Sequence, residues 1–398
     1  MNTATSVSTI TKSETEILNF LLDHALENDL PIAFWRLPNT SVRYLVISHQ
    51  HRALEKNTAI EDLAQGFIFA PFDRDKPSLY LPGDFIFRFE NNWLKDPESP
   101  AEVTSAAWLS EKFRDKPKEI RPVIFRAGTS PVAENSGNFI RLVEKCVEEI
   151  TKEKFEKIVP SRTKLIDLPE DFDIVHSFEK LCTVYPNALV SFVSIPGTGH
   201  WLGATPEALV SVEDNTIFKT VALAGTMPYE EGMNLRAIAW TQKEIEEQAL
   251  VERYVISCFK KIRLREYDEH GPKTVVAGNL VHLKSDFTVD MKATNFPQLG
   301  SVMLQLLHPT AAVCGMPLEP AREFLKENEG YDREFYSGYL GPVNINNHIH
   351  LFVNLRCMKL LDNQGLLYAG AGVTFDSQPE KEWEETEIKF KTLLNVIV

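Results

Sequence analysis

Short apolar runs separated by Pro, Gly, Asn and Asp fill much of this 398-residue chain and constrain its fold more than any other feature. Residues 44–48, 157–162 and 189–195 have the length and the β-branched or aromatic content of strands. They do not alternate regularly with helical patterns, as a parallel sheet made of β-α-β units requires. The sequence therefore predicts an α+β fold of packed antiparallel sheets, and not a doubly wound parallel sheet.

Helical patterns accompany these strands. Apolar spacing and end signals predict helices at about residues 14–30, 136–150, 234–263 and 379–394, the first opened by a capping box of Ser13 and Glu16. Residues 126–137 read as a loop, and we place the main boundary there. We predict an N-terminal segment of helix and strands, residues 1–129, packed on a core of residues 130–398.

The formal charge of −14, from 42 basic and 56 acidic residues, limits the partners of this chain. Such a charge repels nucleic-acid phosphates and anionic lipid head groups. No run approaches the roughly 20 apolar residues that span a bilayer, and the five scattered cysteines fit reduced cytosolic thiols. We therefore expect a cytoplasmic protein that binds neither nucleic acid nor membrane. An anionic substrate would have to be met by local cations or by a metal.

Two pairs of glutamates have a spacing that suits a metal site. Glu244 and Glu247 lie three residues apart in one helical pattern, and Glu382 and Glu385 repeat this spacing in the last one. Each pair projects from one helix face, and four carboxylates could hold Mg²⁺, which prefers oxygen ligands. Other glutamates adjoin both pairs, so the pattern alone also fits a solvated acidic face.

Backbone N–H groups or a cationic side chain could bind the carboxylate of a substrate at three further places. Gly225 with Thr226, and Gly370 with Gly372, follow apolar runs and could present bare N–H groups, although tight turns explain them as well. Neither segment is a dinucleotide or phosphate-loop fingerprint. Arg356 lies in a strand-like run beside Cys357, where an ion pair and a ligand contact are both open.

Taken together, nine segments in sequence resemble the chorismate-utilising enzymes. The matching segments are EKIVPSR (156–162), GATPE (203–207), LAGT (223–226), KEIEE (243–247), LHPT (307–310), YDRE (331–334), NLRC (354–357), YAGAG (368–372) and EWEET (382–386). They keep the order of that family and cover about residues 130–398. The resemblance implies two packed antiparallel sheets with helices outside and the site between them.

Within the family the chain is most similar to the isochorismate synthases. Lys157 matches the lysine of the water-adding members, and Ala224 lies where aminodeoxychorismate synthases carry a nucleophilic lysine. Salicylate synthases share the first lysine, but they tend to have threonine at the position of Ala312 and lack the histidine matching His308. A salicylate synthase and a non-catalytic chorismate-fold module remain the alternatives.

The resemblance implies that water adds at C2 of chorismate while the C4 hydroxyl leaves, without a redox cofactor. Lys157 would be the base that activates water, and Glu207 the acid that protonates the departing hydroxyl. A free lysine has a pKa of about 10.4, so the pKa of Lys157 would have to be lowered and that of Glu207 raised. The alternative for Lys157 is an ordinary surface lysine.

The resemblance also implies the binding groups. Mg²⁺ would lie on Glu247 and Glu385, supported by Glu244 and Glu382, and would bind the ring carboxylate together with backbone at Gly225 and Thr226. The enolpyruvyl carboxylate would be held by Tyr336, Arg356, Lys389 and backbone near Gly370 and Gly372. A salt bridge within the last helix is the alternative for Lys389. We expect a monomer without a glutaminase subunit, whose product enters menaquinone or siderophore synthesis.

Overall fold

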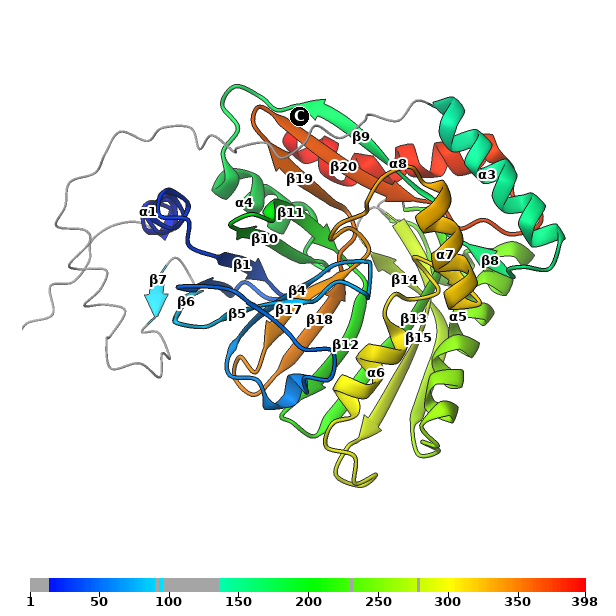
Figure 1. Cartoon of the computed structure of the whole chain (residues 1–398), viewed down its shortest axis with the longest axis horizontal. Coiled ribbons are helices and arrows are strands. Elements are labelled where there is room, and N and C mark those ends of the chain that lie inside the picture. The colour runs from blue at the N-terminus through cyan, green and yellow to red at the C-terminus, as the bar shows by residue number, and fades with distance from the viewer. Residues whose placement is uncertain (1–13, 91–92, 96–135, 230–231, 278–279) are drawn as a thin grey trace, which may run out of the picture.

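The computed structural model describes residues 14–90, 93–95, 136–229, 232–277 and 280–398, which form two large antiparallel sheets (Figure 1). In spatial order, sheet A comprises β7 (Trp93–Lys95), β6 (Phe85–Glu90), β2 (Arg43–Ile47), β1 (Ile32–Arg36), β10 (Leu189–Ile195), β11 (Gly199–Thr205), β19 (Cys357–Leu361), β20 (Gln364–Gly370) and β9 (Ser161–Asp167). Sheet B comprises β14 (Asp268–Ala277), β15 (Leu280–Asp290), β13 (Ile217–Pro228), β12 (Ala208–Glu213), β18 (Ile349–Val353), β17 (Tyr339–Val343), β4 (Gly66–Ala70), β5 (Leu79–Pro82) and β3 (Arg52–Ala53). The predicted α+β class with packed antiparallel sheets is confirmed.

Helices cover the outer face of each sheet. Figure 1 shows α4 (Ile174–Val184) and α8 (Pro379–Ile397) beside sheet A, and α5 (Gln242–Lys261) and α6 (Leu299–Leu307) beside sheet B. The other helical elements are α1 (Glu14–Glu27), α3 (Ser136–Thr151), α7 (Leu318–Asn328) and the 3₁₀ turns η1 (Ile60–Asp62) and η2 (Leu235–Ala237). Among the described helices, none has both the length and the apolar character needed to cross a membrane.

The alternation of side chains along each strand explains why the sheets stack. In β1, Phe34 packs under the helices that cover sheet A, whereas Ala33 and Trp35 point into a cluster shared with sheet B. Successive side chains of a strand face opposite sides, so a fully buried strand fills two cores at once. Each sheet is therefore enclosed between a helical layer and the other sheet.

Strands from the N-terminal segment are paired inside both sheets. β1 pairs with β10 in sheet A, and β4 pairs with β17 in sheet B. The predicted boundary between residues 129 and 130 lies outside the described residues, as does the capping residue Ser13. The described part of residues 1–129 shares backbone ladders with the core as well as side-chain contacts.

Three local predictions were wrong. The predicted strand 157–162 is divided at Pro160 into β8 (Lys157–Ile158), which pairs with β16 (Gly315–Met316), and β9 in sheet A. Helix α5 begins at Gln242 and not near 234, because Thr241 caps it in a capping box with Glu244. Arg356 lies in the link between β18 and β19 with φ of 48°, so it is not part of a strand.

Candidate active site

Two connections that pass between the sheets meet at the site. Glu207 lies on the link from β11 in sheet A to β12 in sheet B, and Arg356 lies on the return link from β18 to β19. The Val353 amide donates to the Glu207 carbonyl at 2.9 Å, and the Ala204 amide donates to the Arg356 carbonyl at 3.0 Å. Sheet pairing thus brings together an acidic and a basic residue that lie far apart in the sequence.

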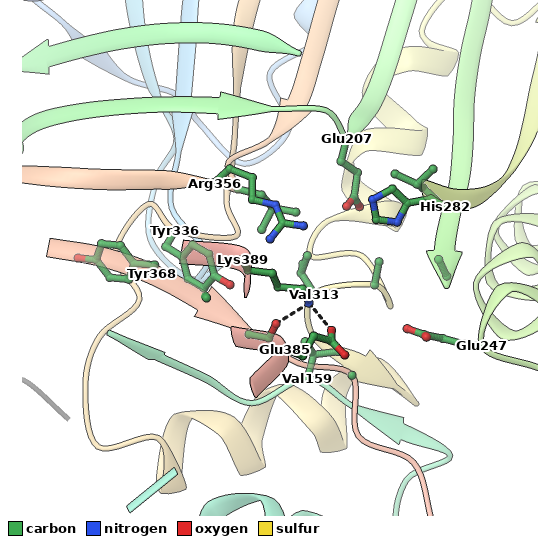
Figure 2. A pocket seen from close by; sticks show the side chains of 17 residues that line it. Val159, Glu207, Glu247, His282, Val313, Tyr336, Arg356, Tyr368, Glu385 and Lys389 are labelled. Carbon is green, nitrogen blue, oxygen red and sulfur yellow. Dashed lines mark hydrogen bonds and ion pairs between the residues drawn. The ribbon is translucent and has the colours of Figure 1, made fainter. Parts of the chain in front are cut away.

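A cavity opens at these links and collects most of the predicted site residues. Those that line it are Glu207, Glu247, Tyr336, Arg356, Gly370, Gly372, Glu385 and Lys389. Figure 2 shows the Arg356 guanidinium and the Lys389 side chain reaching into the same space from different elements. Lys157, Gly225, Glu244 and Glu382 are not part of this lining.

Glu207 has an environment that favours its protonated form. Burial raises the pKa of Glu207 to about 7, although the positive charges of Lys157 and Arg356 oppose this shift. The residue keeps some exposed surface and lines the cavity, while Ala204 and Leu209 beside it are buried. A carboxyl group that still holds its proton near neutral pH can donate that proton to a bound molecule.

Arg356 presents a cation to the cavity that no described carboxylate neutralises. Among the residues that the structure describes, no ion pair to its guanidinium is formed, and Figure 2 shows the group directed into the open space. Removing a permanently charged guanidinium from water is costly unless an anion compensates. This part of the cavity is therefore suited to an anionic ligand. The planar guanidinium of Arg356 can form two parallel hydrogen bonds to a carboxylate.

Lys157 is buried and is not a surface lysine. It is only 1% exposed, and its Nζ donates to Oε1 of Glu247 at 2.7 Å. Burial by itself would raise the pKa of Glu247, but the charge and hydrogen bond of Lys157 outweigh it and hold that pKa below its usual value. Glu247 lines the cavity, so this ion pair links the lysine to the edge of the site.

Lys389 joins the last helix to the end of strand β20. Its Nζ donates to the Gly370 carbonyl at 2.7 Å and to Oε1 of Glu385, one helical turn earlier, at 2.6 Å. Figure 2 draws both contacts at the cavity wall. The intrahelical salt bridge considered from the sequence is present, and the same amine also lines the cavity, so the two interpretations are compatible.

Each of the four glutamates expected around a metal has a separate partner. Glu247 pairs with Lys157, Glu385 with Lys389 and Glu382 with Lys243, while Glu244 caps the Thr241 amide at 3.0 Å. Within the described ranges, no group of three Asp, Glu, His or Cys residues is arranged to hold a metal ion. The glutamates do not form a solvated face either, because Glu247 and Glu385 line the cavity and Glu382 is buried.

Comparison with known proteins places this geometry in one family. A family model described as "Chorismate binding enzyme" matches residues 89–398. The chain belongs to the chorismate-binding enzyme family. This confirms the resemblance of the nine segments and assigns most of the chain to it.

Relatives within the chorismate-binding family carry the isochorismate synthase name. The isochorismate synthase EntC of Escherichia coli K12 is 29% identical over 317 residues, which cover 76% of this chain and 78% of EntC. A structure of a putative 2,3-dihydroxybenzoate-specific isochorismate synthase, DhbC from Bacillus anthracis, superposes with a TM-score of 0.72 at 22% identity and covers 94% of this chain and 98% of its own. The menaquinone-specific isochorismate synthase MenF of Escherichia coli also superposes at 0.72, with 21% identity over 92% of this chain and 89% of MenF. At these identities the two structures show a shared fold.

Three positions distinguish members of this family, at Ala224, Ala312 and His308. Two of the three residues line the cavity. Ala224 and Ala312 both line the cavity, so their small side chains leave room there. His308 is buried elsewhere, with its Nε2 3.0 Å from the Pro71 carbonyl, and it is not among the lining residues. Ala224 and Ala312 therefore bear directly on the shape of this cavity, whereas His308 does not.

Sequence reasoning missed His282, which lines the cavity from β15. Its Nδ1 lies 2.8 Å from the Gly225 carbonyl, and burial lowers the pKa of His282 to about 4, so the ring is neutral near pH 7. Figure 2 shows its ring near Glu207. A single histidine in an apolar strand carries no local signal of function, and only the pairing of β13 with β15 reveals its place.

The glycines occupy positions where a side chain would collide. Gly225 and Thr226 lie at a bulge of β13, where Gly225 has φ of 67°. A Cβ on Gly372 would lie 3.0 Å from Oε1 of Glu247 and 3.1 Å from Cε of Lys157. Gly372 therefore lets the backbone approach the ion pair between these two residues.

We expect Gly372→Ala to lower kcat/KM roughly tenfold, because a small displacement of reacting groups costs one to two orders of magnitude. Steady-state kinetics on the purified variant measures this effect. Gly197→Ala is the control: Gly197 has φ of 76° and a Cβ there meets nothing within 4 Å, so stability falls and turnover stays. Unchanged kinetics in Gly372→Ala would show that the close approach is unimportant.

Proposed function

We propose that this protein is an isochorismate synthase, an isomerase that converts chorismate to isochorismate. The single observation that carries the proposal is the cavity that the carboxyl of Glu207, with its raised pKa, lines together with the guanidinium of Arg356, which has no ion pair to any described residue. The relatives named isochorismate synthase support the same reaction. Chorismate is a dicarboxylate, which suits a cavity that offers Arg356 and Lys389.

The proposed reaction needs one base and one acid. Lys157 removes a proton from water, the water oxygen bonds to C2, both ring double bonds shift by one position, and the C4–oxygen bond breaks. Glu207 supplies the proton that lets the C4 oxygen leave as water, so the atoms of substrate and product balance. Lys157 can act only as a neutral amine, so its ion pair with Glu247 has to open before this step.

Binding of the enolpyruvyl carboxylate is proposed for Arg356, with Tyr336, Lys389 and the backbone of Gly370 and Gly372 close by. We expect Arg356→Met to raise KM for chorismate about 100-fold, because a charge-assisted bidentate contact contributes a few kcal/mol. Arg356→Lys keeps the charge without the fork and serves as the matched variant, with an intermediate KM. An unchanged KM in Arg356→Met would exclude this contact.

We also propose Mg²⁺ as the cofactor. The residues fit: Glu247 and Glu385 line the cavity with oxygen donors, and Oε2 of buried Glu382 has no hydrogen-bond partner within the described residues. Glu247 and Glu385 would hold the ion, supported by Glu244 and Glu382. When bound, Mg²⁺ supplies positive charge that stabilises the ring carboxylate. Lys157 and Lys389 then give up their contacts to Glu247 and Glu385.

Metal removal is the test of this cofactor. We expect EDTA-treated protein to lose turnover and Mg²⁺ to restore it, and we expect Glu385→Gln to raise the Mg²⁺ concentration required. Isothermal titration with Mg²⁺ measures the affinity without reference to turnover. Full activity in EDTA would overturn the metal assignment.

Product analysis tests the function itself. The protein is incubated with chorismate and Mg²⁺, and the products are separated by liquid chromatography and identified by mass. Isochorismate as the accumulating product is expected. Salicylate and pyruvate from chorismate alone would assign a salicylate synthase, and chorismate binding without consumption would assign a non-catalytic module.

A further inference from the structure

A buried ion pair lies beneath the cavity, outside its lining. Arg333 is 3% exposed and Glu329 is 5% exposed, and the Nε of Arg333 donates to Oε2 of Glu329 at 2.7 Å. A second donor, Nη2, contacts Oε1 of the same carboxylate, so the pair is bidentate. The guanidinium also packs over the Phe72 ring, 4.3 Å from its centroid. These groups are held in one geometry from several sides.

The other hydrogen bonds of Arg333 and Glu329 are made mostly to the backbone next to the cavity. Arg333 donates from Nη2 to the Val159 carbonyl at 2.7 Å and from Nη1 to the Val313 carbonyl at 2.8 Å. Glu329 accepts from the Ser161 amide at 2.8 Å and from its hydroxyl at 2.9 Å. Val159 and Val313 both line the cavity (Figure 2). One ion pair therefore fixes two cavity walls relative to each other.

These backbone contacts lie next to Lys157. Val159 follows Lys157 by two residues, and its amide donates to the Cys314 carbonyl at 2.9 Å, just beyond the β8–β16 ladder. On the other side, Ser161 pairs with Gly370 at the start of β9. The segment 157–161 is thus held between the strand that ends at Gly370 and the segment 313–316. Loss of the ion pair would free the part of this segment that follows the lysine.

We propose that Arg333 and Glu329 are positioning residues, which hold the 157–161 segment so that Lys157 is aligned with the ligand in the cavity. Neither side chain touches the cavity, and both act through the carbonyls and amides of Val159, Ser161 and Val313. This inference rests on the proposed function of Lys157. Arg333 and Glu329 would thus support the reaction from outside the cavity lining.

The first test is the conservative variant Arg333→Lys. A lysine keeps the charge, but its single ammonium cannot grip Glu329 bidentately and also hold both carbonyls. We expect kcat to fall about 10- to 100-fold with KM changed less than about threefold, because the base is misaligned while the substrate contacts stay. Arg322→Lys is the matched control: Arg322 lies on α7 and pairs with Asp73, Asp75 and Glu319 near the surface. Wild-type kcat in Arg333→Lys would overturn the proposal.

The second test separates positioning from stability. Arg333→Met alone leaves Glu329 as a buried charge without a partner and is expected to lower Tm strongly. The double variant Arg333→Met with Glu329→Gln removes both charges, so we expect much of the Tm to return while kcat stays low. Recovery of both Tm and kcat would mean that the pair serves the fold alone, and it would overturn the proposal.

Hydrogen exchange gives a readout that does not depend on turnover. In Arg333→Lys we expect faster amide exchange in peptides covering residues 155–163 and 311–317, and unchanged exchange in α8. Wild-type protein that leaves chorismate unchanged would overturn the proposed function. Unchanged exchange in these two peptides would overturn the positioning role, whatever the reaction is.

Discussion

Replacing Lys157 by methionine is expected to abolish turnover and to leave the fold intact. Methionine fills nearly the same volume in this buried position but cannot accept a proton from water. Loss of a general base costs about 10²- to 10⁴-fold in kcat. Glu247, which loses its partner, lines the cavity and keeps contact with water there, so the variant is expected to remain folded.

The measurement is single-turnover and steady-state conversion of chorismate by the purified variant, with circular dichroism to confirm the fold. Lys152→Met is the control, because Lys152 is an exposed lysine that pairs with Glu149 on the surface of the molecule. Its turnover is expected to match the wild type. Retained activity in Lys157→Met would remove Lys157 from the mechanism.

Glu207→Gln is expected to lower kcat by a similar factor and to make the protein more stable at high pH. The amide resembles the protonated carboxyl in shape but cannot release a proton to the leaving oxygen. For the wild type we expect kcat/KM to fall as the pH rises above about 7, because Glu207 then loses the proton that it has to donate. The pH profile of the wild type and the residual rate of the variant measure both effects.

The stability effect follows from the raised pKa of Glu207. Below the ordinary value of 4.5, the carboxyl is protonated in both the folded and the unfolded chain. Between 4.5 and about 7 only the folded chain keeps the proton, so this contribution to stability falls as the pH rises and is lost above about 7. Glutamine is neutral throughout, and we expect Glu207→Gln to be more stable than the wild type by about 2 to 3 kcal/mol at pH 8.

Denaturant unfolding at pH 5 and pH 8 measures this difference. Glu213→Gln is the matched control, since Glu213 pairs with Lys219 in a partly exposed position and is expected to show no such gain. Equal stability of Glu207→Gln and the wild type at pH 8 would contradict the assignment of a partly buried, neutral carboxyl.

Local patterns in the sequence predicted part of this structure. Apolar spacing predicted a helix at residues 379–394, with Glu382 and Glu385 on one face of it. The observed helix α8 contains both residues. The start of α5 was predicted too early, although Thr241 and Glu244 form a capping box that is visible in the sequence. The resemblance to the chorismate-utilising enzymes pointed to Glu207 and Arg356 as site residues, and both line the cavity.

Long-range pairing could not be predicted. The nearness of Glu207 and Arg356 depends on which strands are neighbours where the chain passes between sheets, and no local pattern encodes that order. The same holds for the pairing of Lys157 with Glu247, because 90 residues separate the two in the sequence. His282 was missed for this reason as well.

The pairing of β1 with β10 and of β4 with β17 has a consequence for biosynthesis. As the chain leaves the ribosome, β1 and β4 can pair early with β2 and β5, but their other neighbours, β10 and β17, are made much later. The nascent chain must therefore carry apolar strands with one unpaired edge until β10 and β17 are made, and folding that depends on such distant pairing is slow and prone to aggregation. We infer that high yields of this enzyme depend on slow synthesis or on chaperones that shield those early strands.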